Sequence, residues 1–248
     1  MAIRAVLFDL GETLLHYGSL DTNVVLREAA ELSYRFLVDR LASAPRRLGF
    51  QQYRRRTVWA IKWRYLWSNV TNREFNGLRL LKRVLRRLNL ALSPADLLEL
   101  GWLWYKPLAD RATIDPALPE HLERLTGMGL RLAIVSNTFS PPAVLDRQLR
   151  NLDLLRFFPV RLYSSMTVFR KPDPRIFTRT LRELAVAPAE AVMVGDRLRQ
   201  DITGARRAGI RPVLLRPRPH AARRAPPHVT VIEQIAELPE LVAWWNRT

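Results

Sequence analysis

Hydrophobic and polar positions follow two different patterns along the chain. Outside residues 16–112, short uninterrupted apolar runs alternate with longer segments in which apolar residues recur every three or four positions. Uninterrupted runs of this length are typical of strands buried on both faces of a parallel sheet, and the longer spacing is typical of helices. The expected strands are 3–8, 130–135, 160–163, 191–194, 212–215 and 229–232, and the expected helices are 119–126, 141–152, 174–185, 200–208 and 233–245. This alternation predicts an α/β fold with a doubly wound, mainly parallel, Rossmann-like sheet.

Residues 16–112 contain no such apolar run and show helical spacing in several segments. Pro45, Gly49 and the pair Ser93-Pro94 separate these segments, as helix-breaking residues do. The expected helices are 22–43, 50–70, 73–89 and 94–110. We therefore predict an all-helical insert at 16–112 and a sheet domain formed by residues 1–15 together with 113–248.

The composition narrows the class of protein. A chain of 248 residues that is 48% hydrophobic can bury a large core. It has no cysteine, which excludes disulfides and thiolate metal sites. Asp9 interrupts the apolar start of the chain, which argues against an export signal, and no stretch approaches the ~20 apolar residues of a membrane span. We expect a cytoplasmic protein with no membrane contact, and a solvated loop at 216–228.

The net charge is +17 and the isoelectric point is near 11.3. A charge of this size favours polyanionic partners, either nucleic acid or phosphorylated substrates attracted by the field of the protein. Only four of the 40 basic residues are lysine, however, and so strong a preference for arginine indicates a bias of composition. Binding to nucleic acid is therefore the less favoured interpretation.

Polar residues follow several of the expected strands. The carboxyl ends of parallel strands meet at one edge of an open sheet, where ligands bind. Each residue alone has an ordinary structural explanation, since aspartates cap helices and Ser-Asn pairs form turns. Their occurrence together at one predicted edge favours a functional site. The candidate residues are Asp9, Ser136, Asn137, Lys171, Asp196 and Asp201.

Four stretches around these residues resemble the motifs of the haloacid dehalogenase superfamily of hydrolases, in the branch with a helical cap after the first motif. They span the whole sheet domain, and the last two are long. The stretches are FDLGETL (8–14), IVSNT (134–138), VFRKPDPRIF (168–177) and VMVGDRLRQDITGARRAGI (192–210). The resemblance implies that the insert at 16–112 is a cap that closes over the site and selects the substrate.

The resemblance also implies covalent catalysis of phosphoryl transfer. Asp9 would be the nucleophile that accepts the phosphoryl group as an aspartyl-phosphate. Ser136 and the backbone of Asn137 would bind the phosphoryl oxygens, and Lys171 would neutralise the charge of the carboxylates and of the phosphoryl group. The expected substrate is a small phosphorylated metabolite.

The resemblance implies Mg²⁺ as cofactor, a hard cation that prefers oxygen ligands. The implied ligands are Asp9, the main-chain carbonyl of Gly11, Asp196 and Asp201, the last directly or through water. Three carboxylates in one cleft would also repel each other unless a divalent cation and Lys171 balanced them.

Gly11 departs from the family pattern, because most phosphatases of this family carry a second aspartate there as general acid and base. A general acid typically contributes ~10²–10⁴ in rate, so we expect a slow or leaving-group-limited enzyme. Metal binding should survive, since the metal takes only the carbonyl at this position. Glu12 is an alternative proton donor, although its side chain is expected to point elsewhere in the turn. A structural explanation, that Gly11 supplies a positive φ, is less favoured.

Three other functions stay open at this point. A 2-haloacid dehalogenase also lacks the second aspartate, but it has little need for Asp196 and Asp201. A phosphonate hydrolase would need a cap lysine, Lys62 or Lys82, each of which is more simply a solvated helix charge. A non-catalytic polyanion-binding protein would fit the net charge but not the retained site residues. The oligomeric state also stays open.

The segment 50–70 combines arginines with aromatic residues. Such a surface could recognise a second anionic group or stack on a base. We expect instead that the aromatic residues pack on neighbouring helices while the arginines face water. The aromatic residues are Trp59, Trp63, Tyr65 and Trp67.

Overall fold

A computed structural model describes residues 1–40, 49–216 and 229–248. Its sheet has six strands in the order β3-β2-β1-β4-β5-β6, and every neighbouring pair is parallel. The strands are β1 (Ala5–Phe8), β2 (Arg131–Ser136), β3 (Val160–Tyr163), β4 (Ala191–Gly195), β5 (Arg211–Leu215) and β6 (Thr230–Ile232). The predicted Rossmann-like parallel sheet is confirmed, and each expected strand is present.

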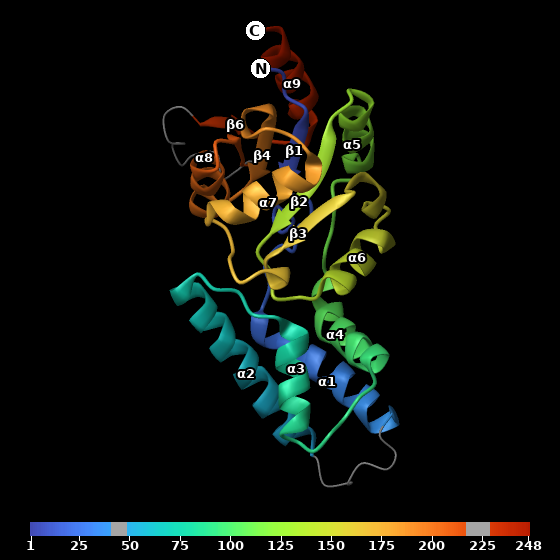
Figure 1. The fold of residues 1–248 in the computed structure, drawn as a ribbon. Coiled ribbons are helices and arrows are strands. Elements are labelled where there is room, and N and C mark those ends of the chain that lie inside the picture. The colour runs from blue at the N-terminus through green and yellow to red at the C-terminus, as the bar shows by residue number, and fades with distance from the viewer. Residues whose placement is uncertain (41–48, 217–228) are drawn as a thin grey trace.

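Helices cover both faces of the sheet (Figure 1). The helices of one face are α5 (Leu118–Gly127), α6 (Pro142–Asn151) and α9 (Leu238–Arg247), and those of the other are α7 (Pro174–Leu184) and α8 (Gly204–Arg207). Side chains of β1 alternate between the two cores, with Val6 and Phe8 in the first and Ala5 and Leu7 in the second. Burial on both faces explains why this strand is apolar at every position.

Four further helices lie together at the other end of the molecule (Figure 1). They are α1 (Thr22–Arg40), α2 (Phe50–Thr71), α3 (Gly77–Arg86) and α4 (Pro94–Ala109). Side-chain oxygens cap two of them, since Asn76 accepts from the N–H of Arg79 and Ser93 from that of Asp96. We call residues 16–112 the helical unit.

The chain enters and leaves the helical unit at one point. His16 and Thr113 form an antiparallel bridge in which each backbone N–H donates to the carbonyl of the other at 2.8 Å. The unit touches the sheet domain again at Gly77, whose N–H donates to the carbonyl of Phe139 at 2.8 Å. A Cβ at position 77 would lie only 2.8 Å from that oxygen, so this approach requires glycine.

The helix predicted over 73–89 is shorter in the structure. It begins at Gly77, because Arg73 is extended and forms a bridge with Phe169. Asn76 then uses its side chain as the N-cap, which places it outside the helix. A contact with a distant segment therefore overrides the helical spacing of these four residues.

The helix predicted over 200–208 also differs. It begins as a π-helical turn at Leu198–Thr203 and continues into α8. Two further expectations, the end of the first insert helix at 41–43 and most of the loop at 216–228, fall outside the described residues.

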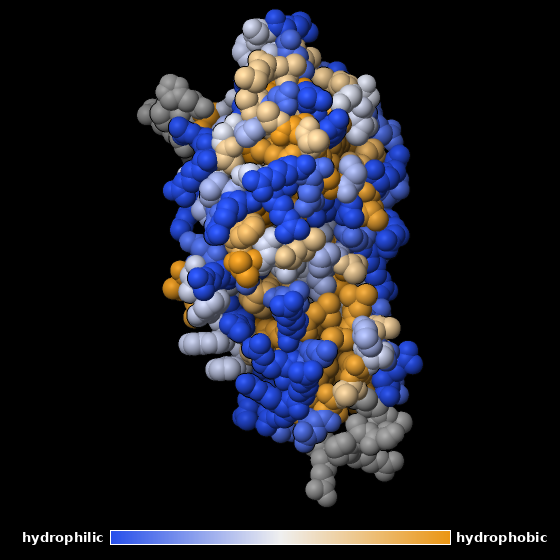
Figure 2. Space-filling model, viewed as in Figure 1, coloured by the Kyte–Doolittle hydropathy of each residue, from blue (hydrophilic) through white to orange (hydrophobic). Residues whose placement is uncertain are grey.

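Hydrophilic side chains cover most of the face seen in Figure 2, over both the sheet domain and the helical unit. Apolar side chains also reach this face within the helical unit. Among the helices in the described ranges, none combines the length and the apolar character needed to cross a membrane.

Candidate active site

Asp9 lies at the carboxyl end of the central strand of the sheet. Phe8 pairs with Ile134 of β2 and with Val194 of β4, so the loops after these strands begin beside Asp9. The strand order changes direction between β1 and β4, which makes this edge the switch point where ligands bind in open α/β sheets. The predicted residues at the ends of the two neighbouring strands here are Ser136, the last residue of β2, and Asn137 and Asp196, which follow β2 and β4.

Lys171 is buried and bridges two carboxylates. Its ammonium lies 2.8 Å from Oδ1 of Asp9 and 2.6 Å from Oδ1 of Asp201. Burial by itself would lower the pKa of Lys171, but the negative charges of Asp201 and Asp9 outweigh it and raise that pKa. Lys171 therefore stays protonated and holds the two carboxylates together.

The side chain of Asn137 positions Lys171. Its Nδ2 donates to the carbonyl of Lys171 at 2.9 Å, and the N–H of Lys171 donates to its Oδ1 at 2.8 Å. This pair of hydrogen bonds fixes the backbone from which the lysine side chain enters the site. The sequence motif assigns Asn137 only a backbone contact with substrate, so this use of its amide is an addition to the prediction.

Asp201 reaches the site from the π-helical turn. Its Oδ2 accepts a hydrogen bond from the N–H of Arg197 at 2.9 Å. A Cβ on Gly195 would overlap the Asp201 carboxylate, so the glycine that ends β4 provides the space for it. The carboxylate of Asp201 thus accepts hydrogen bonds both from the backbone of the turn and from Lys171.

Asp9, Asp196 and Asp201 together fit a divalent cation. Each offers a carboxylate oxygen, and these oxygens all lie within 4.8 Å of one another. Oδ1 of Asp196 is buried and has no hydrogen-bond partner in the protein, although buried polar atoms are almost always paired. Three oxygen donors of a hard type, one of them unpaired, are a ligand set suited to Mg²⁺.

The carboxylates carry more negative charge than Lys171 can balance. Burial and then the charge of Asp9 raise the pKa of Asp196 to about 6. Burial is also the main reason why the pKa of Asp201 is raised to about 7, with Lys171 opposing the shift and Asp9 adding to it. The site therefore favours either a proton or a metal cation beside these two groups.

Gly11 lies next to open space that is bordered by Tyr17. Its backbone is not in the left-handed region, so the explanation by a positive φ is wrong. A Cβ at this position would lie 3.5 Å from the Tyr17 ring, an ordinary contact. Glu12 instead has the positive φ, 57°, and its Oε1 accepts a hydrogen bond from the N–H of Tyr17 at 3.2 Å. The carboxylate of Glu12 therefore braces the turn.

A cavity of about 420 Å³ lies between this edge of the sheet and the helical unit. Its floor includes Asp9, Ser136, Asn137 and Lys171. The opposite wall is built mostly from apolar and aromatic side chains of the four helices, namely Val25, Leu26, Ile61, Tyr65, Leu78, Leu81, Trp104, Tyr105 and Leu108. The volume is in the range of sites for small molecules.

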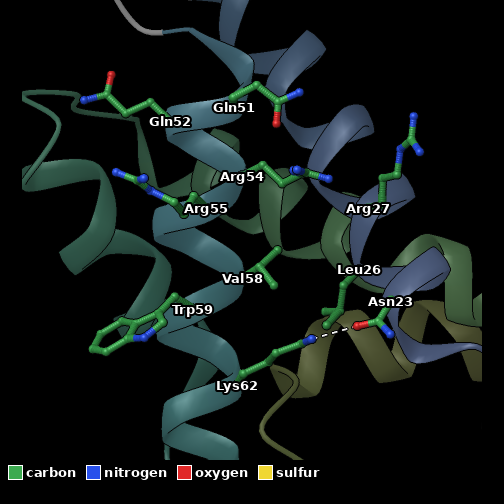
Figure 3. A pocket seen from close by; sticks show the side chains of 10 residues that line it. All are labelled: Asn23, Leu26, Arg27, Gln51, Gln52, Arg54, Arg55, Val58, Trp59 and Lys62. Carbon is green, nitrogen blue, oxygen red and sulfur yellow. Dashed lines mark hydrogen bonds between the residues drawn. The ribbon is translucent and has the colours of Figure 1, made fainter.

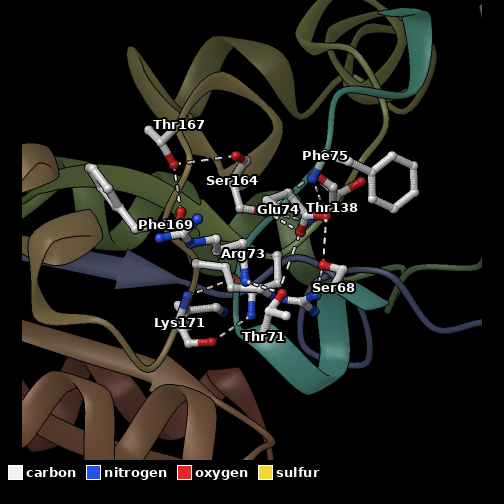
Figure 4. Close-up of polar contacts among 12 residues, drawn as sticks. Ser68, Thr71, Arg73, Glu74, Phe75, Thr138, Ser164, Thr167, Phe169 and Lys171 are labelled. Carbon is white, nitrogen blue, oxygen red and sulfur yellow. Dashed lines mark hydrogen bonds and ion pairs between the residues drawn. The ribbon is translucent and has the colours of Figure 1, made fainter. Parts of the chain in front are cut away.

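A buried polar network joins the helical unit to the sheet domain at the rim of this cavity (Figure 4). The carboxylate of Glu74, whose side chain is 3% exposed, accepts hydrogen bonds from Ser164 at 2.7 Å and Ser68 at 3.3 Å. The guanidinium of Arg170 lies 3.7 Å from Glu74 and also donates to Ser68. The two charged groups of the network, Glu74 and Arg170, therefore pair with each other.

A second hollow, of about 670 Å³, lies between α1 and α2 (Figure 3). It contains Arg27, Arg54, Arg55 and Lys62, and the ammonium of Lys62 donates to Asn23 at 2.7 Å. None of these cations lines the cavity beside Asp9. The basic residues of these two helices thus face away from the candidate active site.

The expectation that the aromatic residues of α2 pack on neighbouring helices is wrong. All four residues named for it are exposed, including Tyr65 at 50% and Trp67 at 37%. Trp59 and Trp63 are 63% and 56% exposed, and their rings stack on each other with centroids 6.0 Å apart. They lie one turn apart on the same face of α2, which allows their rings to stack.

The two lysines considered for a phosphonate hydrolase are also outside the cavity. Lys62 and Lys82 are exposed, and neither is among the residues that line the space beside Asp9. A Schiff base formed by either lysine would therefore not reach a substrate at this site.

Comparison with known proteins identifies the family. A family model for haloacid dehalogenase-like hydrolases matches residues 3–209. The chain belongs to this family. The haloacid dehalogenase-like hydrolase described here is therefore an enzyme, as its motifs predict.

Relatives of this hydrolase include named phosphatases. It is 31% identical over 223 residues, 86% of its length and 84% of the relative's, to a ribulose-1,5-bisphosphate 5-phosphatase of Halopiger xanaduensis. It is 39% identical over 95 residues, 38% of its length and 40% of the relative's, to a glyceraldehyde 3-phosphate phosphatase of Methanopyrus kandleri. The crystal structure of a 2-haloacid dehalogenase of Pseudomonas syringae shares the fold, with a TM-score of 0.66, 24% identity, and coverage of 98% of this chain and 99% of that one.

Several residues of the site are absent from the sequence prediction. Tyr17 and Tyr105 line the cavity, and their hydroxyls are 3.3 Å apart. Glu74 and Arg170 form the ion pair at its rim. One signal was present in the sequence, because Glu74 is the only acidic residue between residues 40 and 95. An acidic residue that stands alone in the sequence among many arginines is a candidate for a specific ion pair.

Proposed function

We propose that this hydrolase is a Mg²⁺-dependent phosphatase that acts on a small phosphorylated metabolite through an aspartyl-phosphate on Asp9. The observation that carries the proposal is the cluster of Asp9, Asp196 and Asp201, in which Lys171 pairs with Asp9 and Asp201 and Asp9 lines the cavity. The phosphatase names of two relatives support it. A dehalogenase is less favoured, since an organic halide has little need for Asp196 and Asp201.

The hydrogen bonds of Asp9 define its reactive atom. Oδ1 accepts from the N–H of Leu10 at 2.7 Å and from Lys171 at 2.8 Å, which leaves Oδ2 for attack on phosphorus. The new bond joins Oδ2 to phosphorus as the bond from phosphorus to the leaving oxygen breaks. Water then attacks the phosphorus of the aspartyl-phosphate, releases inorganic phosphate and restores the carboxylate.

Other residues hold the phosphoryl group during both steps. The hydroxyl of Ser136 and the ammonium of Lys171 line the floor and would donate to its oxygens. Mg²⁺, held by Asp9, Asp196, Asp201 and the carbonyl of Gly11, would supply positive charge that offsets the phosphoryl oxygens. No side chain of the second-aspartate type is available at Gly11, so departure of a poor leaving group is expected to limit the rate.

We also propose that residues 16–112 act as a cap on a core formed by 1–15 and 113–248. The cavity is lined from both parts, and the two connecting segments pair at His16 and Thr113. Closure of such a cap would exclude water from the phosphoryl group and select the substrate.

Asp196→Asn tests the metal. We expect the variant to bind Mg²⁺ at least about tenfold more weakly and to lose phosphatase activity in parallel, because a charged ligand with an unpaired buried oxygen is replaced by a neutral amide. Mg²⁺ affinity can be measured by the rise in melting temperature as the metal is titrated, and activity with 4-nitrophenyl phosphate. Asp153→Asn, at an exposed aspartate outside the cluster, is the matched control.

The same titration has an expected pH dependence. The pKa values of Asp196 and Asp201, about 6 and about 7, lie above the usual 3.8, so the metal-free protein loses stability as the pH rises from about 4 to about 7. Mg²⁺ needs both groups ionised, and its stabilisation should therefore be larger at pH 8 than at pH 5.5. Wild-type turnover of 4-nitrophenyl phosphate that persists in excess EDTA would contradict the proposed dependence on Mg²⁺.

A further inference from the structure

We infer that the cavity accepts phosphomonoesters with an apolar organic part and discriminates against substrates that carry a second phosphate. This inference rests on the proposed phosphatase function and concerns the class of substrate. The positive charge at the lining of the cavity comes from one part of the molecule. The lysines and arginines that line it are Arg170, Lys171 and Arg197, all from loops of the sheet domain. Within the described part of residues 16–112, no lysine or arginine lines it.

The three cations are not placed to receive a distal phosphate. Lys171 is held between Asp9 and Asp201 on the floor, where the first phosphoryl group would bind. Arg170 is paired with Glu74 and donates to Ser68. The guanidinium of Arg197 lies 3.9 Å from the carboxylate of Asp196, so it lies at the sheet edge and not at the far wall. A second phosphate at the far wall would therefore be buried without a cation, which is strongly unfavourable.

The far wall presents hydrocarbon to the cavity. On α3, Leu78 and Leu81 face the space, while the basic residues between and beyond them, Arg79, Lys82 and Arg83, are exposed. The other apolar contributions come from α1, α2 and α4 and are Val25, Leu26, Ile61 and Leu108. Methylene groups of a ligand would exchange water for these side chains, and each would gain affinity.

Several polar atoms of this wall already have partners in the protein. The hydroxyls of Tyr17 and Tyr105 are 3.3 Å apart, and the indole N–H of Trp104 donates to the hydroxyl of Tyr53 at 3.1 Å. Glu74 is enclosed in its network with Arg170. Few polar atoms are therefore left for a sugar-like substrate, which would bury most of its hydroxyls against apolar side chains at a cost in affinity. The wall thus favours an alkyl or aryl group over a polyol.

This expectation separates the chain from one of its relatives. The name of the Halopiger xanaduensis relative, which is 31% identical, specifies a bisphosphate as substrate. The cavity described here has one cluster for a phosphoryl group and an apolar wall opposite it. An overall identity of 31% therefore does not imply that the two proteins act on the same substrate.

Matched esters test the inference. Ethyl, butyl and hexyl phosphate have leaving groups of similar basicity, so differences in kcat/KM report binding of the chain. We expect kcat/KM to rise about threefold to fourfold for each methylene that becomes buried. We also expect hexyl phosphate to exceed both sorbitol 6-phosphate and 1,6-hexanediol bisphosphate, the latter differing only by its distal phosphate. A flat series, or a preference for the polyol or the bisphosphate, would overturn the inference.

A pair of neighbouring variants locates the effect in the wall. Val25 lines the cavity, whereas Val24 is 44% exposed and lies outside its lining. Val25→Lys should shift the ratio of kcat/KM for the bisphosphate over hexyl phosphate by about tenfold or more in favour of the bisphosphate. Val24→Lys adds the same charge one residue away and should leave the ratio unchanged. Equal ratios in the two variants would contradict the assignment of the wall.

The outcomes distinguish this inference from the function on which it rests. Turnover that depends on Asp9 but favours the polyol or the bisphosphate overturns the substrate class alone. Absence of Asp9-dependent turnover for every ester, including 4-nitrophenyl phosphate, overturns the phosphatase itself and the inference with it. Circular dichroism and the melting temperature of Val25→Lys are measured alongside, and Tyr65→Lys, at an exposed position of the cavity lining, replaces it if the variant does not fold.

Discussion

Asp9→Asn should lower kcat for 4-nitrophenyl phosphate by about 10⁴-fold or more at saturating Mg²⁺. The amide is nearly the same size as the carboxylate but cannot form an acyl-phosphate, so the two-step route is closed. The fold should persist, because Lys171 keeps its contact with Asp201 at 2.6 Å and one of three mutually repelling charges is removed. Activity, the circular dichroism spectrum and the melting temperature of the variant are compared with those of the wild type.

The covalent step can be observed directly. Rapid acid quenching of the wild type with a labelled phosphate ester should trap labelled protein, and Asp9→Asn should trap none. The exposed-site variant Asp153→Asn should behave as the wild type in both measurements. Residual activity of Asp9→Asn above about one per cent, or label that survives the substitution, would mean that another residue is the nucleophile.

The sheet and the place of the site follow from local sequence. The apolar runs of β1 and β4 are uninterrupted because these central strands are buried on both faces, and Val6 and Leu7 of β1 do face opposite cores. Parallel strands end at one edge, so the positions of Asp9, Ser136 and Asp196 could be predicted from the strands alone. Predicting the positions of these three residues requires no knowledge of tertiary contacts beyond the order of the strands.

Lys171 illustrates what local patterns do not contain. It lies eight residues after β3, and its place depends on two hydrogen bonds with Asn137, 34 residues away in the sequence. Glu74 similarly reaches Ser164 across 90 residues. Hydrophobic spacing carries no information on such pairs, because it reports only which face of an element is buried.

The helical unit shows the same limit in another form. Arginines and tryptophans occur together along α2, and their spacing fits either packing or exposure. The structure buries Tyr53 and Ile61 and exposes Trp59 and Trp63, because the buried face is set by the neighbours of the helix. The packing of the helices therefore determines which side chains line the cavity. The composition of the helical unit, which is rich in arginine, does not predict that the wall of the cavity is apolar.

Gly11→Asp should raise kcat on alkyl phosphates much more than on 4-nitrophenyl phosphate. Nitrophenolate departs as a stable anion, whereas an alkoxide needs a proton, and an aspartate at this position would supply it. The structure permits the side chain, since the backbone is not left-handed and a Cβ would lie 3.5 Å from the Tyr17 ring. The gain should stay below the general-acid range of ~10²–10⁴, because no hydrogen bonds are built to orient the new carboxyl group.

Gly11→Asn is the matched control, because it adds nearly the same volume without a transferable proton. It should leave the ratio of the two activities unchanged, and both variants should keep the wild-type melting temperature. Equal effects of Gly11→Asp on alkyl and aryl phosphates, or a wild type that already turns over both alike, would assign the proton to another group such as Glu12 or Tyr17.

Tyr17 is the weaker of these substitutes. Burial is the main cause that raises the pKa of its hydroxyl, with Glu12 and Asp9 adding to the shift, so the phenol stays protonated at neutral pH. It could donate to a leaving alkoxide but could not accept the proton of the water that attacks the aspartyl-phosphate. A carboxylate can do both, so Gly11→Asp should accelerate formation of the intermediate from alkyl esters and also its hydrolysis. The intermediate is the same for every ester, so only its formation can distinguish alkyl from aryl phosphates. Single-turnover measurements that separate the two steps should therefore show a larger acceleration of formation for alkyl esters than for 4-nitrophenyl phosphate, and acceleration of hydrolysis alone would contradict this assignment.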